Sequence, residues 1–169
     1  NEQIILDEGV KAAKTTIRSV LAKSGVDAAD VKGLGISGQM HGLVLLDENG
    51  KILPEVIDVL DVIARYNMIL CTGHISVPEG KALIKAAKER KVEKIICTHV
   101  DSELCFYEIE DQLELIKKYG VYVEHCTNSC TSGKVEWDVC LNQIKSVGCD
   151  HVIISTDLGQ SKHKYPDEG

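Results

Sequence analysis

Apolar residues recur at steps of three and four positions through the first part of the chain. The residues that follow this spacing are Ile5, Leu6, Val10, Ala13, Ile17, Val20 and Leu21. Because this spacing places them on one face of a helix, we predict an amphipathic helix over residues 3–24. Gly25 follows, and glycine commonly ends a helix because it adopts the left-handed backbone conformation at little cost.

In the next stretch the apolar residues form short runs, which indicate strands. Residues 31–37 read as a short strand. Residues 43–46 and 51–53 are rich in apolar residues and flank Asp-Glu-Asn-Gly. An Asn-Gly pair between two such runs indicates a tight hairpin turn. The sequence therefore predicts a helix–strand–hairpin segment at its N-terminal end.

From Pro54 onward, helical and extended patterns alternate. Proline favours the first position of a helix, so a helix is expected to begin at Pro54. The predicted helices span residues 54–65, 78–90, 110–119 and 135–147, and the predicted strands span residues 67–71, 94–99, 121–124 and 151–155. These strands lack strict alternation of apolar and polar residues, which is typical of parallel βα units. The predicted fold class is therefore α/β, built from parallel βα units.

The composition narrows the range of partners. The 169 residues are 44% apolar and 27% charged, with a formal net charge of −7. An acidic chain is a poor match for nucleic acid or an anionic membrane surface, so we expect neither as a partner. The sequence has no apolar run of the ~18 residues that a membrane span requires. Its N-terminal stretch does not resemble a secretory signal, and we expect a cytoplasmic protein.

The seven cysteines favour buried thiols over a cysteine cluster. Cys71 and Cys97 lie inside apolar runs, where cysteine behaves as a small hydrophobic residue. The later cysteines follow the spacing C-x3-C-x9-C-x8-C, at Cys126, Cys130, Cys140 and Cys149. None of them has the C-x2-C spacing of a zinc knuckle, so the spacing gives little support for a cluster site.

Groups that can bind metal or titrate follow each predicted strand of the second part. They are His74, His99, Glu124 with His125, and Asp157. In parallel α/β proteins the carboxyl ends of the strands form one rim, where active sites are built. We therefore predict a metal or acid–base site at this rim.

The motifs that contain these residues resemble a known class of enzyme. TGHIS, CTH and STDLGQ occur in that order, and the chain from about residue 45 to 169 resembles the C-terminal half of an amidohydrolase-type, metal-dependent (βα)8 barrel. The resemblance implies half of such a barrel, and a hydrolase in which metal-activated water attacks an amide, ester or related bond. The H-x-H pair that this class carries on its first strand does not occur in the sequence.

The resemblance also implies roles for individual residues. His74 and His99 match metal ligands, and Asp157 matches a carboxylate that binds metal and takes a proton from the attacking water. Glu124 and His125 match positions on the rim. The implied cofactor is a divalent metal, zinc first, with manganese or nickel as alternatives, and the implied partner is a small-molecule substrate.

The first part resembles a different family. Residues 33–53, with the motif SGQMHGLVLLD, are similar to FGGY-family carbohydrate kinases of the xylulokinase type. This resemblance implies that Met40 and His41 contact sugar hydroxyls. It divides the chain into a kinase-like segment, residues 1–53, and a hydrolase-like segment, residues 54–169.

Three functions therefore stay open: a metal-dependent hydrolase, a carbohydrate kinase fragment, and a non-catalytic α/β module. Metal binding would favour the first of these and sugar binding the second. A half-barrel leaves sheet edges and apolar faces uncovered, so we also expect the chain to form a homo-oligomer.

Overall fold

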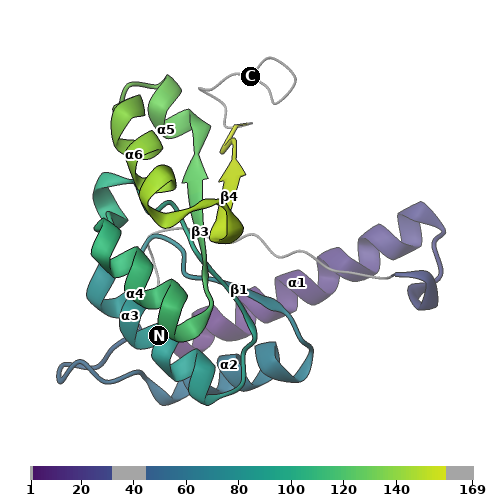
Figure 1. Ribbon diagram of the computed structural model, residues 1–169. Coiled ribbons are helices and arrows are strands. Elements are labelled where there is room, and N and C mark those ends of the chain that lie inside the picture. The colour runs from purple at the N-terminus through teal and green to yellow at the C-terminus, as the bar shows by residue number, and fades with distance from the viewer. Residues whose placement is uncertain (1, 32–44, 159–169) are drawn as a thin grey trace. The chain divides into compact units, whose positions relative to one another are not determined.

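The structure is a computed structural model that describes residues 2–31 and 45–158 (Figure 1). The chain divides into two compact units, residues 1–38 and residues 39–169. Within the described residues, no helix is both long and apolar enough to cross a membrane.

Some predictions fall on parts of the chain that the structure does not describe. The predicted strand over residues 31–37 lies outside the described residues except for its first position, and Met40 and His41 lie outside them entirely. The division into segments 1–53 and 54–169 rests on family resemblance and stays a prediction.

The first unit contains the predicted N-terminal helix. Helix α1 spans Glu2–Ser24, and Gly25 follows it with a φ of 68°. A short 3-10 helix, η1 (Ala28–Asp30), comes next, and the side chain of Asp27 accepts a hydrogen bond from the backbone N–H of Ala29 at 2.9 Å. This carboxylate caps one of the backbone donors that a helix leaves unpaired at its start.

The second unit consists of alternating helices and strands. Its helices are α2 (Pro54–Arg65), α3 (Val77–Glu89), α4 (Ile109–Tyr119), α5 (Thr127–Thr131) and α6 (Trp137–Val147), with 3-10 turns η2 (Glu103–Cys105) and η3 (Cys149–His151). Its strands are β1 (Ile69–Cys71), β2 (Lys94–Cys97), β3 (Tyr122–Cys126) and β4 (Val152–Ser155). All four strands are parallel, in the order β1-β2-β3-β4. The predicted α/β class with parallel βα units is confirmed.

Local signals account for several helix ends. Pro54 opens α2 as predicted. Ahead of α3, the backbone N–H of Ser76 donates to the Glu79 carboxylate at 3.1 Å, which forms a capping box. Gly120 closes α4 with a φ of 62°, in the left-handed region that glycine adopts most readily.

Two elements differ from the prediction. Among the described residues, which exclude 43 and 44, the predicted hairpin contains an antiparallel bridge between Leu46 and Ile52 and no assigned strand. The Oδ1 atom of Asp47 closes the turn, because it accepts hydrogen bonds from the backbone N–H groups of Asn49 and Lys51 at 2.9 and 2.8 Å. The other difference is α5, which was not predicted because its sequence, TNSCT, has no apolar periodicity.

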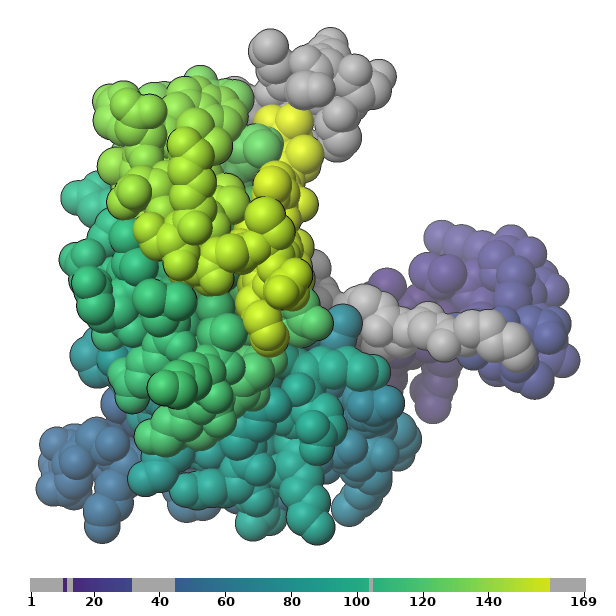
Figure 2. All heavy atoms as spheres, viewed as in Figure 1, coloured from purple at the N-terminus to yellow at the C-terminus, as the bar shows by residue number. Residues whose placement is uncertain are grey.

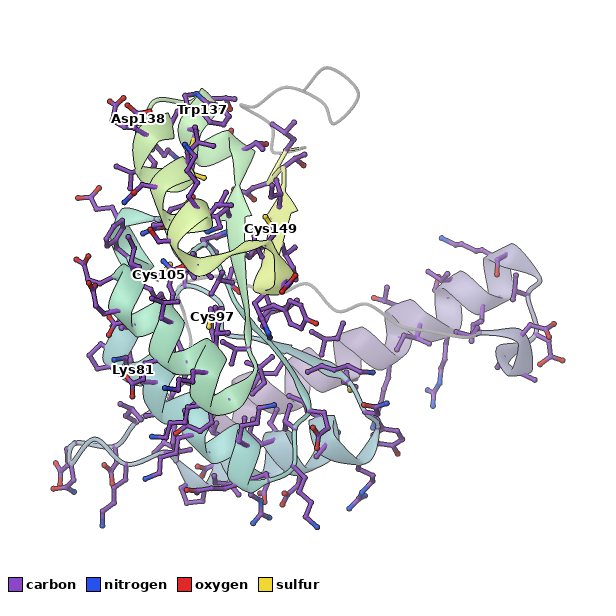
Figure 3. The ribbon with its side chains drawn as sticks, in the orientation of Figure 1. Lys81, Cys97, Cys105, Trp137, Asp138 and Cys149 are labelled. Carbon is purple, nitrogen blue, oxygen red and sulfur yellow. The ribbon has the colours of Figure 1, made fainter. Side chains whose placement is uncertain are left out.

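The helices cover one face of the sheet. Helices α3, α4 and α6 follow one another along one side of the strands, and α4 contacts both α3 and α6 (Figure 1). Lys81 of α3, labelled in Figure 3, joins α3 to α4 by donating to Asp111 at 2.6 Å and Glu114 at 3.3 Å. Between these helices and the sheet lies a buried core that includes Leu83, Ile84, Ile95, Cys97, Leu115, Val121 and Val123.

The opposite face of the sheet is more exposed. Parallel strands in register present neighbouring residues to the same face, so Cys71, Ile96 and Tyr122 form one row across three strands. Tyr122 is 42% exposed, and Ile69, on the same face as Cys71, is 56% exposed. In a closed barrel this face would be the interior.

Candidate functional site

Two of the predicted metal ligands lie together at the carboxyl ends of β1 and β2. The rings of His74 and His99 have centroids 4.9 Å apart and meet edge to face at 61°. Both side chains are half-buried. The structure therefore brings together two imidazoles from adjacent strand ends, as the rim prediction requires.

A reciprocal pair of hydrogen bonds holds the two turns in place. Thr72 Oγ1 accepts from the backbone N–H of Thr98 at 3.0 Å, and Thr98 Oγ1 accepts from the backbone N–H of Gly73 at 3.1 Å. Each threonine lies within two residues of one of the histidines. The pair therefore fixes how the two histidine-bearing turns sit relative to each other.

His99 is the centre of a polar chain that crosses three strands. Its Nδ1 lies 3.4 Å from the Glu124 carboxylate and 2.8 Å from Sγ of Cys126. The same sulfur lies 2.9 Å from the Ser155 hydroxyl, on β4. Glu124 and Cys126 are two residues apart on β3 and share one face, because side chains alternate along a strand.

The Cys126 thiol is held in its neutral form. Burial raises its pKa to about 12, and the carboxylates of Glu124 and Asp157 add to the shift while the hydrogen bond with Ser155 opposes it. A neutral thiol is a weak nucleophile, because the thiolate is the reactive form. In the absence of a cation, Cys126 is therefore a hydrogen-bonding group of the rim.

Two residues of the predicted site have an unusual backbone conformation. His99 has a φ of 51° and Asp157 a φ of 52°, both in the left-handed region. Non-glycine residues occupy that region at a cost and tend to do so where neighbouring structure holds them, often at functional sites. Each lies two residues beyond the end of a strand, which is where active sites form in parallel α/β proteins.

Asp157 lies at the same rim but is more exposed to solvent than the two histidines. It follows β4, its side chain is exposed, and its charge acts on Cys126. Its predicted role as metal ligand and proton acceptor stays a prediction.

His125 does not join this group. It neighbours Glu124 on β3, so its side chain points to the opposite, helix-covered face, where it is 1% exposed. Its Nδ1 lies 3.1 Å from Oδ2 of Asp101. Although it was predicted as a rim residue, His125 belongs to a separate, buried cluster.

Sequence reasoning missed two members of the rim. Cys126 and Ser155 both contact the site, but neither was predicted there. Cys126 could have been found from its position, because it follows Glu124 at the strand period of two. Ser155 is the first residue of the motif STDLGQ, two positions before Asp157.

The donor atoms at the rim fit a divalent metal. Ligand atoms of His99, Glu124 and Cys126 all lie within 4.8 Å of one another, and the His74 ring is adjacent. Imidazole, carboxylate and sulfur are the donors that zinc takes in proteins, and imidazole with carboxylate also suits manganese or nickel. The chemistry of the rim is therefore compatible with the predicted cofactor.

Comparison with known proteins shows two relationships. Xylulose kinase of Bacillus subtilis (strain 168) is 25% identical over 165 residues, in a match that covers 90% of this chain. The chain spans only 31% of the length of that kinase. No solved structure matches the chain. Residues 11–124, more than half of the chain, match the model of a family of unknown function, DUF6282, and the chain therefore belongs to that family.

Proposed function

We propose that this chain is a metal-dependent hydrolase whose site is the rim formed by His74, His99, Glu124 and Asp157. The observation that carries the proposal is the contact of two histidine rings from adjacent strand ends, with a carboxylate against Nδ1 of one of them. The amidohydrolase-like motifs TGHIS, CTH and STDLGQ contain His74, His99 and Asp157. Neither of the two matches reported above concerns a hydrolase, so the proposal rests on the site and its motifs.

The contacts assign different tasks to the rim residues. Because Nδ1 of His99 already contacts Glu124 and Cys126, its Nε2 is the nitrogen we assign to the metal. A carboxylate on the far nitrogen fixes the tautomer and orientation of a ligating imidazole. Glu124 is therefore a positioning residue, and the 2.8 Å contact gives Cys126 a supporting role of the same kind.

The remaining rim residues would bind the metal and accept a proton from its bound water. His74 and His99 would hold the ion, with Asp157 as the carboxylate ligand. A bound zinc ion supplies a water molecule that ionises near neutral pH and serves as the nucleophile. Asp157, exposed at the end of β4, accepts the proton of that water. The substrate class that fits this chemistry is a small molecule with an amide, ester or related bond.

The first test is the metal content of the purified chain. Elemental mass spectrometry should find zinc, manganese or nickel, and a His74→Ala/His99→Ala double variant should lose one equivalent of it. His151→Ala is the matched control, because its ring contacts the carbonyl of Val121 at 2.9 Å, at the amino end of β4. A double variant that keeps the full metal content of the wild-type chain would exclude the rim site.

A second candidate is a sugar-binding module related to carbohydrate kinases. The match to a xylulose kinase over most of this chain favours it. Met40 and His41 would then contact sugar hydroxyls, as their motif implies. Calorimetric titration with xylulose tests this candidate, and binding that is lost in Met40→Ala and His41→Ala would support it. Absence of both metal and sugar binding would leave a non-catalytic α/β module.

A further inference from the structure

A second cluster of metal-binding side chains lies buried on the helix-covered side of the sheet. Three segments contribute to it: the turn after β2, strand β3 and helix α6. The residues are Asp101, His125 and Cys140, which are 1%, 1% and 6% exposed. None of them was assigned to the rim site by its contacts.

The spacing of the donor atoms matches a tetrahedral metal site. His125 Nδ1 lies 3.1 Å from Asp101 Oδ2 and 3.6 Å from Cys140 Sγ, and all three donor atoms lie within 4.8 Å of one another. Zinc bonds of about 2.0 Å to oxygen and nitrogen and about 2.3 Å to sulfur imply edges of about 3.3 and 3.5 Å in a tetrahedron. The two observed separations are close to these edges.

The cluster leaves polar atoms without partners among the described residues. Asp101 Oδ1 and His125 Nε2 are buried and lack a hydrogen bond. A buried carboxylate is costly unless it is paired or coordinates a metal. A divalent ion would neutralise the Asp101 carboxylate and the Cys140 thiolate together, giving three ligands and an ion with no net charge. Oδ1 of Asp101 would then be available as a second oxygen ligand.

Cys130, on helix α5, lies next to this set of three residues. Its thiol interacts with the Cys140 thiol, and burial raises the pKa of Cys140 to about 12. The Cys140 thiol therefore stays protonated in this environment unless a cation displaces the proton, which is how zinc binds cysteine.

We infer that Asp101, His125 and Cys140 form a structural zinc site beneath helix α6. Figure 2 shows the atoms of α6 and β4 at the outer surface of the second unit, and Figure 3 labels Trp137 and Asp138 at the start of α6. With Oδ1 of Asp101 as a fourth donor atom, the ion has no open position, which distinguishes a structural zinc site from a catalytic one. The ion ties α6 to the sheet. This inference does not depend on the proposed hydrolase function.

Cobalt substitution tests the site directly. The full chain is stripped of metal under reducing conditions and titrated with Co²⁺, whose bonds to thiolate give an intense near-ultraviolet charge-transfer band. We expect this band at one equivalent, and its loss in a Cys140→Ser variant. A wild-type chain without the band, or a Cys140→Ser variant that retains it, would overturn the inference.

Variants of the rim separate this site from the proposed catalytic one. The His74→Ala/His99→Ala variant and a Cys126→Ser variant should both keep the thiolate band, because neither removes a ligand of the buried cluster. A band that disappears with Cys126 would place the thiolate ligand at the rim and contradict the inference. Loss of rim metal with the band intact would support both proposals, and retention of rim metal in the histidine variant would overturn only the hydrolase proposal.

A third set of variants distinguishes the loss of a metal ligand from misfolding of the chain. Asp101→Asn keeps the shape of the side chain while it removes a charged ligand. We expect it to fold by circular dichroism but to bind zinc at least tenfold more weakly. Cys97→Ala is the matched control, since Cys97 is fully buried on β2 and lies outside the cluster (Figure 3). The Cys97→Ala variant should keep the metal. The melting temperatures of the wild type and of this control should both fall when a chelator removes zinc. A wild-type melting temperature that a chelator leaves unchanged would count against the site.

Discussion

Thr72 and Thr98 hydrogen-bond reciprocally across the ends of two neighbouring strands. Each hydroxyl accepts from a backbone N–H of the other turn, at 3.0 and 3.1 Å. Thr72 is 3% exposed, so water is a poor substitute for its hydroxyl. Because His74 and His99 each follow one of these threonines within two residues, the geometry of the rim depends on this pair.

Replacing Thr72 with valine should therefore weaken both the fold and the rim. The change keeps the shape but leaves the Thr98 N–H without its acceptor, at a cost of about 1–3 kcal/mol in the free energy of unfolding. Metal affinity at the rim should fall by about 10–100-fold, the usual effect of losing a supporting contact. Urea unfolding and metal titration measure the two effects.

Thr15→Val is the control for the threonine substitution. Thr15 is exposed on α1, where its hydroxyl donates to the Lys11 carbonyl at 2.8 Å. It should change the free energy of unfolding by no more than about 0.5 kcal/mol, as surface substitutions usually do. An equal loss of stability in both variants would show that the Thr72–Thr98 pair has no special role.

Gly80 and Tyr107 form a second close relationship, in the core. A Cβ atom at Gly80 would lie 1.9 Å from the hydroxyl oxygen of Tyr107, which is 1% exposed. Gly80→Ala should therefore destabilise the second unit by roughly 1–3 kcal/mol, although alanine favours helices. Urea unfolding of Gly80→Ala, with the exposed Lys85→Ala on the same helix as a control, measures the effect.

A double variant identifies the atom responsible. In Tyr107→Phe the hydroxyl is absent, and the nearest remaining atom to the new Cβ, Cζ, is 3.2 Å away. Gly80→Ala should then cost less in the Tyr107→Phe background than in the wild type. Equal costs in the two backgrounds would mean that the helix backbone, and not the tyrosine, resists the substitution.

Local signals in the sequence predicted the elements of the second unit well. Pro54 marks the start of α2 and Gly120 the end of α4, because each residue has a backbone preference that acts without help from distant parts of the chain. The parallel class followed from the alternation of helical and apolar extended segments. The helix α5 was missed because no apolar period marks it.

The sites were predicted only in part. The strand ends that carry His74 and His99 meet because parallel strands share one carboxyl edge, and that rule needs only the element order. The separation of Glu124 from His125 follows from strand alternation, but which of them faces the helices depends on sheet packing. Asp101 and Cys140 meet only through the packing of α6, and the sequence spacing of the cysteines gave no sign of it.

We propose that the chain self-associates through the uncovered face of the sheet. The face that presents Ile69 and Tyr122 is apolar and exposed, and a second copy of the chain would remove it from water. We expect the apparent mass by light scattering to rise with concentration across the micromolar range. An Ile69→Lys/Tyr122→Lys variant should stay monomeric, whereas Val59→Lys on α2, where Val59 is 57% exposed, should associate as the wild type does. A wild-type chain that is monomeric throughout would contradict the proposal.

The buried thiols predict loss of stability in alkaline solution. Burial raises the pKa of Cys97 from 9.0 to about 12. The folded chain therefore keeps this proton while the unfolded chain releases it, so the contribution is fully present below about pH 9 and is lost as pH rises towards 12. Within this window each such thiol lowers the free energy of unfolding by up to about 1.4 kcal/mol per pH unit.

Removing one thiol should flatten this dependence. Cys97→Ala lowers stability at pH 7 because it leaves a small cavity, but its stability should fall less steeply above pH 9 than that of the wild type. Urea unfolding at several pH values under reducing conditions gives both quantities, with Cys149→Ala, an exposed cysteine, as the control for removing a thiol. Parallel curves for wild type and Cys97→Ala would show that Cys97 ionises alike in the folded and unfolded chain, and that its burial in the sheet is not maintained in solution.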